Sequence, residues 1–335
     1  MSGFLGMRKF GSLIDERTKQ RGKNQEDLIP FGVNYLDDAL EGILKNDLVL
    51  ITAPSGVGKT ELVSQIALNA ARRGKRIYFL ALESYPGEVE ERLIYKAAVQ
   101  RFYADPQRAP GLPDYLKWAH GKQESFLSKY YPEAEKEIRA FRDLIDIRDG
   151  GEPFGLEDFT KVFVQAARAD GAQLVILDHL HYMDHGDEDD NRGYKKALMK
   201  MQELIKDHGV PVILVAHIRK RDRKAKVVAP GMEDIHGSSD IFKMVTKMIS
   251  IAKAPAEHGG KTRWPTYMRT AKCRYGGARD QYVGICVFDV TTNSYETSYE
   301  VGQLSYLEDE VEILAPTERP HWYRSERSRA LERGE

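Results

Sequence analysis

Cysteine is scarce in this sequence, which contains only Cys273 and Cys286 among its 335 residues. Two thiols are too few for a disulfide framework, and their spacing matches no metal-binding motif, so they indicate a reducing compartment. Long apolar runs are also missing, and the N-terminus has no signal-peptide core. We therefore expect a cytoplasmic protein that makes no contact with a membrane.

An excess of charge of one sign is absent as well. The chain has 50 Lys and Arg residues against 51 Asp and Glu residues, which gives a net charge of −1. This balance excludes a uniformly basic protein, so any contact with nucleic acid must come from a local basic patch. Hydrophobic residues make up 41% of the chain, which is enough to bury a substantial core.

Short apolar runs alternate with helical patterns along most of the chain. The runs are continuously apolar, which is typical of strands buried on both faces of a parallel sheet. Helical patterns follow three of them, so the sequence predicts a doubly wound, mostly parallel α/β fold. The predicted strands are 48–52, 77–82, 174–177, 210–216 and 248–252, and the predicted helices are 61–73, 88–101 and 194–207.

The sequence also predicts how the chain is divided. Two later runs, 267–274 and 282–289, flank Gly276 and Gly277 and predict a C-terminal antiparallel hairpin that extends the sheet. The expected domains are an N-terminal arm or linker helix at 1–27, one α/β domain at 28–300, and a C-terminal tail at 301–335 that is arginine-rich and poorly ordered from about residue 315. Between residues 102 and 149 the pattern is less regular, apart from a charged helical stretch near 133–144.

The strongest motif is a phosphate-binding P-loop between the first predicted strand and the first predicted helix. A glycine-containing turn lets successive backbone N–H groups converge on phosphate oxygens, and the helix that follows presents its positive end to them. In such a loop the lysine reaches the β- and γ-phosphates of ATP, and the last hydroxyl binds Mg²⁺. The motif departs from the usual pattern only at its first residue, an alanine, and consists of Ala53, Pro54, Ser55, Gly56, Val57, Gly58, Lys59 and Thr60.

Three later strands each end next to a group that suits nucleotide chemistry. Ligands bind at the carboxyl ends of parallel strands, so Glu83, Asp178 and His217 are expected beside the P-loop. Asp178 is predicted to hold Mg²⁺ together with Thr60, and Glu83 to polarise the attacking water as a general base. His217 is predicted to sense the γ-phosphate. The alternatives are capping carboxylates and a structural histidine.

A histidine-rich stretch follows Asp178 and has two interpretations. Histidines two residues apart on a strand can share a face, so one interpretation is a transition-metal site. We favour the other, in which these side chains neighbour a magnesium–nucleotide site or lie in a solvated loop. The residues concerned are His179, His181, Asp184 and His185.

Positive charge is dense in one segment directly after His217. The segment is not amphipathic, and a cationic loop at the nucleotide edge suits sequence-independent contact with the phosphates of single-stranded DNA. A solvated charged loop is the alternative. The predicted DNA-binding residues are Arg219, Lys220, Arg221, Arg223, Lys224 and Lys226.

The order of these motifs resembles that of the ring-forming replicative helicases of the DnaB, phage gene 4 and Twinkle type, which make up superfamily 4. The resemblance covers residues 28–298 and implies a RecA-like P-loop ATPase domain. It rests on 31–37 (FGVNYLD), 78–83 (YFLALE), 174–183 (LVILDHLHYM), 210–219 (VPVILVAHIR) and 235–240 (IHGSSD).

The last matching segment, 271–277 (AKCRYGG), is similar to a K-x-R-x-G hairpin of that family. There, the lysine and arginine reach into the ATP site of the neighbouring subunit. The resemblance therefore implies that Arg274 is an arginine finger and Lys272 its companion, which would stabilise charge developing on the γ-phosphate. Without the resemblance, the two cations would be interpreted as an exposed basic edge strand.

Motifs and resemblance together predict an ATP-driven DNA helicase or translocase that works as a homo-oligomeric ring, a hexamer. Single-stranded DNA is the expected track, and primase or other replication proteins are expected partners. One alternative is a RecA-like ATPase that does not unwind DNA but acts as a filament, loader or scaffold. Another is a small-molecule kinase, although the sequence shows no lid or acceptor pocket for one.

Overall fold

The structure, a computed structural model, describes residues 11, 28–85, 87–122, 125–186, 189–217, 230, 238–255, 260, 262–276, 280–305, 310–325 and 328–329. The N-terminal arm expected at 1–27 lies outside these residues apart from Gly11. None of the described helices combines the length and the apolar character needed to cross a membrane.

One ten-stranded sheet forms the centre of the fold, with the order β10-β9-β8-β7-β6-β1-β5-β4-β2-β3. The strands from β1 to β6 pair in parallel, which confirms the predicted α/β fold class. The strands predicted from apolar runs are confirmed, whereas β3 was not predicted. The parallel strands are β1 (Leu48–Ala53), β2 (Ile77–Ala81), β3 (Ile145–Asp149), β4 (Leu174–Asp178), β5 (Val212–His217) and β6 (Lys247–Lys253).

The sheet continues beyond β6 through antiparallel strands. The predicted hairpin is β7 (Arg263–Cys273) with β8 (Tyr282–Asp289), and β7 also pairs with β6. Two further strands, β9 (Ser294–Ser305) and β10 (Glu310–Ile313), widen this extension beyond the prediction. Polar and charged residues interrupt both strands, which is why apolar runs did not reveal them.

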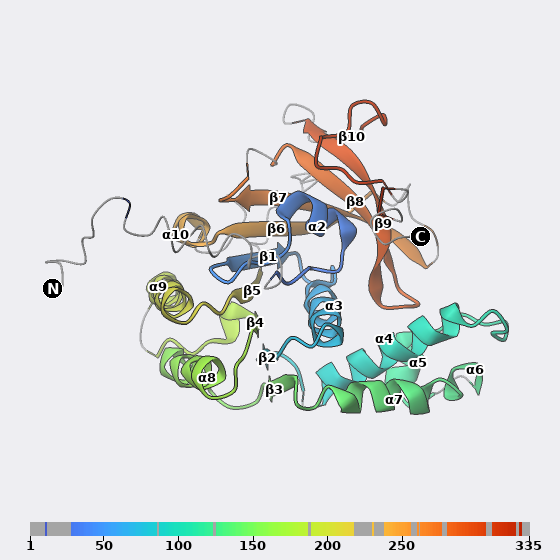
Figure 1. Cartoon of the computed structure of the whole chain (residues 1–335), viewed down its shortest axis with the longest axis horizontal. Coiled ribbons are helices and arrows are strands. Elements are labelled where there is room, and N and C mark those ends of the chain that lie inside the picture. Colours follow the sequence, from blue (N-terminus) through green and yellow to red (C-terminus); the bar gives the residue numbers. More distant parts are fainter. Residues whose placement is uncertain are drawn as a thin grey trace, which may run out of the picture.

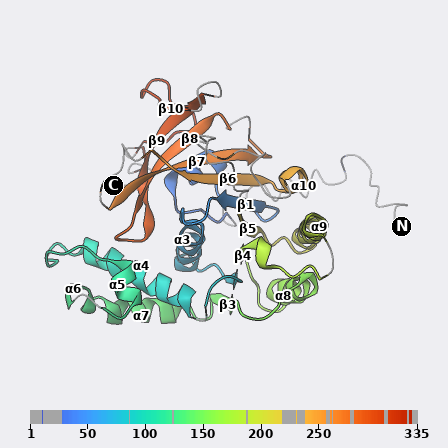
Figure 2. The ribbon, with the colours of Figure 1, turned by 180° about the vertical axis from the view of Figure 1, so that it is seen from behind.

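Helices cover both faces of the sheet (Figure 1, and from behind in Figure 2). On one face, α2 (Asn34–Leu40) and α3 (Lys59–Arg72) contribute to a large apolar core. The other face carries a second core that includes side chains of α8 (Leu156–Arg168), α9 (Asp190–His208) and α10 (Ser238–Met244). Because both faces are covered, β1 and β4 are buried along their whole length.

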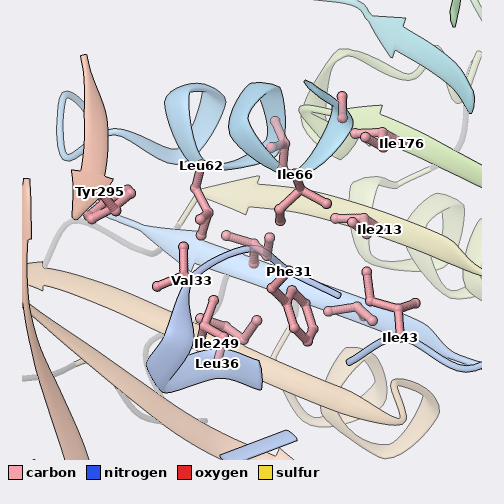
Figure 3. Close-up of a cluster of buried hydrophobic side chains, with 14 of the residues drawn as sticks. Phe31, Val33, Leu36, Ile43, Leu62, Ile66, Ile176, Ile213, Ile249 and Tyr295 are labelled. Atoms are coloured by element: carbon pink, nitrogen blue, oxygen red, sulfur yellow. The ribbon is translucent and has the colours of Figure 1, made fainter. Parts of the chain in front are cut away.

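Figure 3 shows how the first core forms. Ile176, Ile213 and Ile249 lie on β4, β5 and β6, and all three are fully buried on the face that α3 covers with Leu62 and Ile66. Burying each side chain of this size stabilises the fold by roughly 1.5–3 kcal/mol. This packing fixes the start of α3, and with it the P-loop, against the ends of the central strands.

A helical excursion between β2 and β3 has a small aromatic core of its own. Phe102 is buried there, with ring centroids 5.3 Å from Phe126 and 5.8 Å from Tyr130. The sequence predicted a helix at 88–101 and a charged helical stretch near 133–144 in this region, and it did not predict the two short helices between them. The structure has α4 (Glu88–Ala104), α5 (Tyr115–Ala119), α6 (Ser125–Ser128) and α7 (Tyr131–Ala140).

The C-terminal segment differs from the poorly ordered tail expected at 301–335. Its first residues belong to β9, and Trp322 is 9% exposed. The Trp322 ring lies against Tyr35 of α2 and Tyr282 of β8, at centroid distances of 6.0 and 5.7 Å. The described part of the segment therefore packs on the domain, and the expectation was wrong for it.

The arginines that suggested disorder pair with one buried carboxylate. Arg324 and Arg329 both form ion pairs with Asp38 of α2, the first at 2.7 Å, and the Tyr299 hydroxyl donates to the same group at 2.5 Å. Asp38 is 3% exposed, so these partners offset the cost of burying its charge. The sequence alone could not show that distant Asp38 supplies the counter-charge.

We predict that Trp322→Ala destabilises the fold, because it removes a large buried ring from the contact with α2 and β8. The expected loss in the free energy of unfolding is about 3 kcal/mol, measured by urea denaturation at fixed protein concentration. His321→Ala is the matched control, since its side chain is exposed and next in sequence. Equal stability of the two variants would contradict the packing of this segment.

Candidate functional site

The carboxyl ends of the parallel strands surround a cavity of about 490 Å³. The P-loop lies at the end of β1 and leads into α3, and its residues from Ser55 to Thr60 line the cavity. Glu83 and His217 line it too, following β2 and ending β5. The sequence analysis expected these groups at one edge of the sheet, and the structure brings them together there.

The P-loop has the backbone shape that phosphate binding requires. Gly56 and Gly58 have φ angles of 74° and 97°, in the left-handed region that favours glycine. A Cβ on Gly58 would also lie 3.1 Å from the Tyr295 hydroxyl. Helix α3 begins directly after this turn at Lys59, so its N-terminal N–H groups point toward the cavity.

Lys59 lines the cavity. Its Nζ donates to the carbonyl oxygens of Ala53 and Pro54, at 3.0 and 3.2 Å, and lies 3.2 Å from Nδ1 of His217. Burial lowers the pKa of Lys59, while the carboxylates of Asp178 and Glu83 raise it. A triphosphate in the cavity would add negative charge that stabilises the protonated lysine.

Asp178 at the end of β4 is 1% exposed. Its pKa is raised to about 7, mainly by burial and also by the nearby Glu83, while a hydrogen bond from the Thr60 side chain and the charge of Lys59 lower it. Its Oδ1 atom is shielded from solvent and accepts no hydrogen bond from the described residues. A buried carboxylate oxygen without a donor, next to a hydroxyl, suits a hard cation such as Mg²⁺, so the two predicted ligands fit this ion.

Glu83 lies beside His179, a residue that the sequence analysis expected only as a neighbour of the site. The Nδ1 atom of His179 is 2.6 Å from Oε2 of Glu83 and 3.2 Å from Oδ1 of Asp178. The pKa of His179 is lowered to about 3, mainly by burial and also by the nearby His217 and Lys59, so its ring is neutral at pH 7. His179 has a φ of 74° and lines the cavity.

His217 stacks on His179, with ring centroids 4.5 Å apart and an interplanar angle of 26°. Burial lowers the pKa of His217, and the nearby Lys59 lowers it further. The His217 imidazole is neutral, contacts the P-loop lysine and ends β5. A movement of Lys59 on binding or loss of a phosphate would therefore act directly on the end of this strand. This position is compatible with the sensor role predicted for His217.

The residues that could together bind a metal ion in the structure differ from the set predicted from the sequence. Ligand atoms of Glu83, His179 and His217 all lie within 4.8 Å of one another. His185 of the expected set instead packs on Tyr194, with centroids 4.7 Å apart. Since Glu83 and His217 already have nucleotide roles in the prediction, the interpretation as neighbours of a nucleotide site remains the simpler one.

Sequence reasoning missed the cavity wall opposite these strands. The antiparallel extension supplies it, and Lys253 places its Nζ 4.8 Å from the centroid of the Trp264 ring. None of these residues belongs to a recognisable motif. Lys253 ends β6, Trp264, Thr266 and Phe288 lie on the two strands predicted only as a hairpin extension, and Asn293 lies between β8 and β9. The wall residues are Lys253, Trp264, Thr266, Phe288 and Asn293.

Lys272 and Arg274 lie away from this cavity. In the antiparallel register, Thr266 pairs with Lys253 at the cavity end of β6, and Cys273 pairs with Lys247 at the opposite end. Lys272 donates to the backbone carbonyls of Phe242 and Lys243 in α10, the second at 3.3 Å. Arg274 is exposed beyond the strand. The structure therefore does not bring either cation to the nucleotide cavity of its own chain.

Two further predicted elements cannot be placed. The basic segment with Arg219, Lys220, Arg221, Arg223, Lys224 and Lys226 lies outside the described residues. So does most of the 235–240 segment, of which the backbone is described only from Ser238, at the start of α10.

The fold and the cavity together define a P-loop ATPase domain of the RecA-like class. The strand order, the glycine turn before α3 and the strand-end carboxylates all belong to this class.

The chain belongs to the AAA domain family, whose model matches residues 16–223, well over half of the chain. Among proteins it is similar to the DNA helicase/primase of Enterobacteria phage T3, with 24% identity over 262 residues. That match includes 73% of this chain but 42% of the phage protein, so the chain spans less than half of this relative.

Solved structures show the same fold. One solved ATPase domain superimposes with a TM-score of 0.69 at 18% identity, over 87% of this chain and 100% of that domain. A DnaB-like replicative helicase, solved for its interactions with primase, gives a TM-score of 0.67 at 17% identity, over 86% and 67% of the two chains. The RecA-like fold predicted from the resemblance to DnaB-like helicase domains is confirmed.

We predict that Lys59→Ala weakens nucleotide binding by roughly a hundredfold, because a charge-assisted contact to the phosphates is lost. Isothermal titration calorimetry with ADP and Mg²⁺ measures the change. Lys206→Ala is the control, since it removes an exposed lysine of α9. Wild-type affinity in Lys59→Ala would rule out the P-loop as the binding site.

Proposed function

We propose that the chain is the motor domain of an ATP-dependent DNA helicase or translocase that hydrolyses ATP between the subunits of a homohexameric ring. One observation carries this proposal: base, magnesium ligand and P-loop lysine meet in one cavity, while the predicted finger lies at the opposite end of the sheet. A site divided in this way needs a second copy of the chain.

The residues of one chain supply the first half of the chemistry. Lys59 and the N–H groups of the P-loop bind the β- and γ-phosphates. Thr60 and Asp178 would hold Mg²⁺, which would supply positive charge to the phosphate oxygens. Glu83 accepts the proton of the water that attacks the γ-phosphate, and the Nδ1 atom of His179 lies 2.6 Å from its carboxylate.

The second half comes from the neighbouring subunit. Arg274 is exposed and cannot reach its own cavity, because β7 carries it to the other end of the sheet. From an adjacent copy it would stabilise charge developing on the γ-phosphate, with Lys272 beside it. Burial lowers the pKa of Lys272, and the nearby Arg274 lowers it further. A phosphate group arriving beside Lys272 would favour its protonated, charged form.

Single-stranded DNA is the proposed track. The basic segment at 219–226 leaves the end of β5, directly after the proposed sensor His217, so hydrolysis at the cavity can be linked to DNA contact. Two of the similar proteins are a helicase/primase and a helicase solved for its interactions with primase, and they support a role in replication with primase as a partner.

We expect single-stranded DNA to stimulate ATP hydrolysis by at least about tenfold, because DNA contact and the phosphate sensor share one element. The assay is phosphate release with and without a single-stranded oligonucleotide, together with strand displacement on a forked duplex. Hydrolysis that ignores DNA, without displacement, would favour the scaffold alternative.

Arg274→Ala should leave nucleotide affinity near that of the wild type and lower turnover by roughly a thousandfold, since only transition-state charge is affected. Glu83→Gln should also be inactive, in this case because the general base is lost. Mixed rings of the two variants contain interfaces with an intact Glu83 and an intact Arg274. Such mixtures should recover part of the activity, and absence of recovery would exclude a finger acting between subunits.

A further inference from the structure

One buried polar group in the wall of the nucleotide cavity has no described partner. Asn293 lies between β8 and β9, lines the cavity together with Trp264 and Phe288, and is 8% exposed. Its Nδ2 atom is shielded from solvent and donates no hydrogen bond to the described residues. A buried donor without an acceptor costs roughly 1–3 kcal/mol, so a ligand that supplies the missing acceptor would explain why an amide occupies this position.

The backbone around this amide is held firmly from one side. Asn293 has a φ of 51°, which asparagine tolerates better than most residues. Its carbonyl accepts from Lys96, a fully buried lysine of α4 whose Nζ also lies 2.6 Å from Oε2 of Glu61 in α3. The Tyr95 hydroxyl donates to the carbonyl of Thr291 at 2.6 Å. Helix α4 therefore anchors the turn, and Figure 1 shows the β8–β9 hairpin reaching toward it.

The P-loop and its helix hold the same turn from the other side. The amide group of Gln65 in α3 bonds both backbone groups of Tyr295, at 2.9 and 3.1 Å. The Tyr295 hydroxyl donates to the carbonyl of Val57 in the P-loop at 3.1 Å. Asn293 is thus fixed relative to the phosphate-binding loop, which is the arrangement expected of a preorganised recognition group.

The surroundings of Asn293 suit the nucleoside half of a nucleotide. The phosphates already have donors in the P-loop N–H groups and in Lys59. The wall near Asn293 instead offers aromatic rings, with Trp264 39% exposed, and flat apolar surfaces of this kind accept a base. Ligand sites commonly combine such surfaces with a few placed polar groups that fix orientation.

We propose that the Asn293 side-chain amide donates a hydrogen bond to an acceptor on the nucleoside half of the bound nucleotide, and so helps to determine which nucleotides the site takes. The acceptor lies on the base edge or on the ribose. This inference rests on the proposed nucleotide binding at the P-loop and adds a specificity-determining residue to it.

The test compares a nucleoside diphosphate with a ligand that has only the phosphates. Asn293→Gly keeps the left-handed backbone and removes the amide, whereas Asn293→Asp keeps the shape and removes the donor. Calorimetry on the full chain with Mg²⁺ gives affinities for ADP, GDP, CDP, 2′-deoxy-ADP and inorganic pyrophosphate. Thr292→Ala is the control, since its hydroxyl donates to the Asp289 carbonyl at 3.3 Å and does not line the cavity.

We expect both Asn293 variants to bind ADP about tenfold more weakly and pyrophosphate as the wild type does. A loss confined to some bases assigns the acceptor to the base edge, and a loss for ADP that is absent for 2′-deoxy-ADP assigns it to the ribose. Equal weakening of ADP and pyrophosphate, or no weakening of either, would overturn the inference. Absence of all binding by the wild type would instead refute the proposed function.

Discussion

The balance of charge around Lys59 is the interaction on which this site depends. Burial opposes the charge of the ammonium, and Asp178 and Glu83 support it from the ends of neighbouring strands. The pKa of Asp178 is raised to about 7, mainly by burial, so the nearby cations and donors do not fully offset the cost of burying the charge of this carboxylate. Lysine and carboxylate are held close by the packing of α3 on the sheet. A triphosphate with Mg²⁺, as proposed for this site, would satisfy both groups at once.

Much of this arrangement follows from the sequence because parallel strands impose it. Continuous apolar runs identified the central strands, and their carboxyl ends necessarily meet at one edge, so Glu83, Asp178 and His217 could be placed beside the P-loop. No tertiary information was needed for that step. The sequence did not reveal that His179 lies 2.6 Å from Glu83 or that it has a φ of 74°, because a positive φ at a residue other than glycine is uncommon and leaves no signal in a sequence pattern.

The antiparallel extension shows where sequence reasoning fails. Its strands carry mixed polar and aromatic residues, and their partners are set by contacts across the fold rather than by periodicity. Trp264 and Phe288 form the cavity wall only because β7 and β8 pair beside β6. The C-terminal arginines resembled a disordered tail because their counter-charge, Asp38, lies far away in sequence and is buried.

The same extension links the two halves of the proposed ring site. Strand β7 lines the nucleotide cavity at Thr266 and carries Arg274 just beyond its other end, so one strand connects a chain's own cavity with the surface that we propose faces a neighbour. The most direct measurement is an experimental structure of the assembled chain with Mg²⁺ and a non-hydrolysable ATP analogue. The account predicts the γ-phosphate in contact with Lys59 of one subunit and Arg274 of the next. A nucleotide bound away from Lys59, or complete within one subunit, would contradict it.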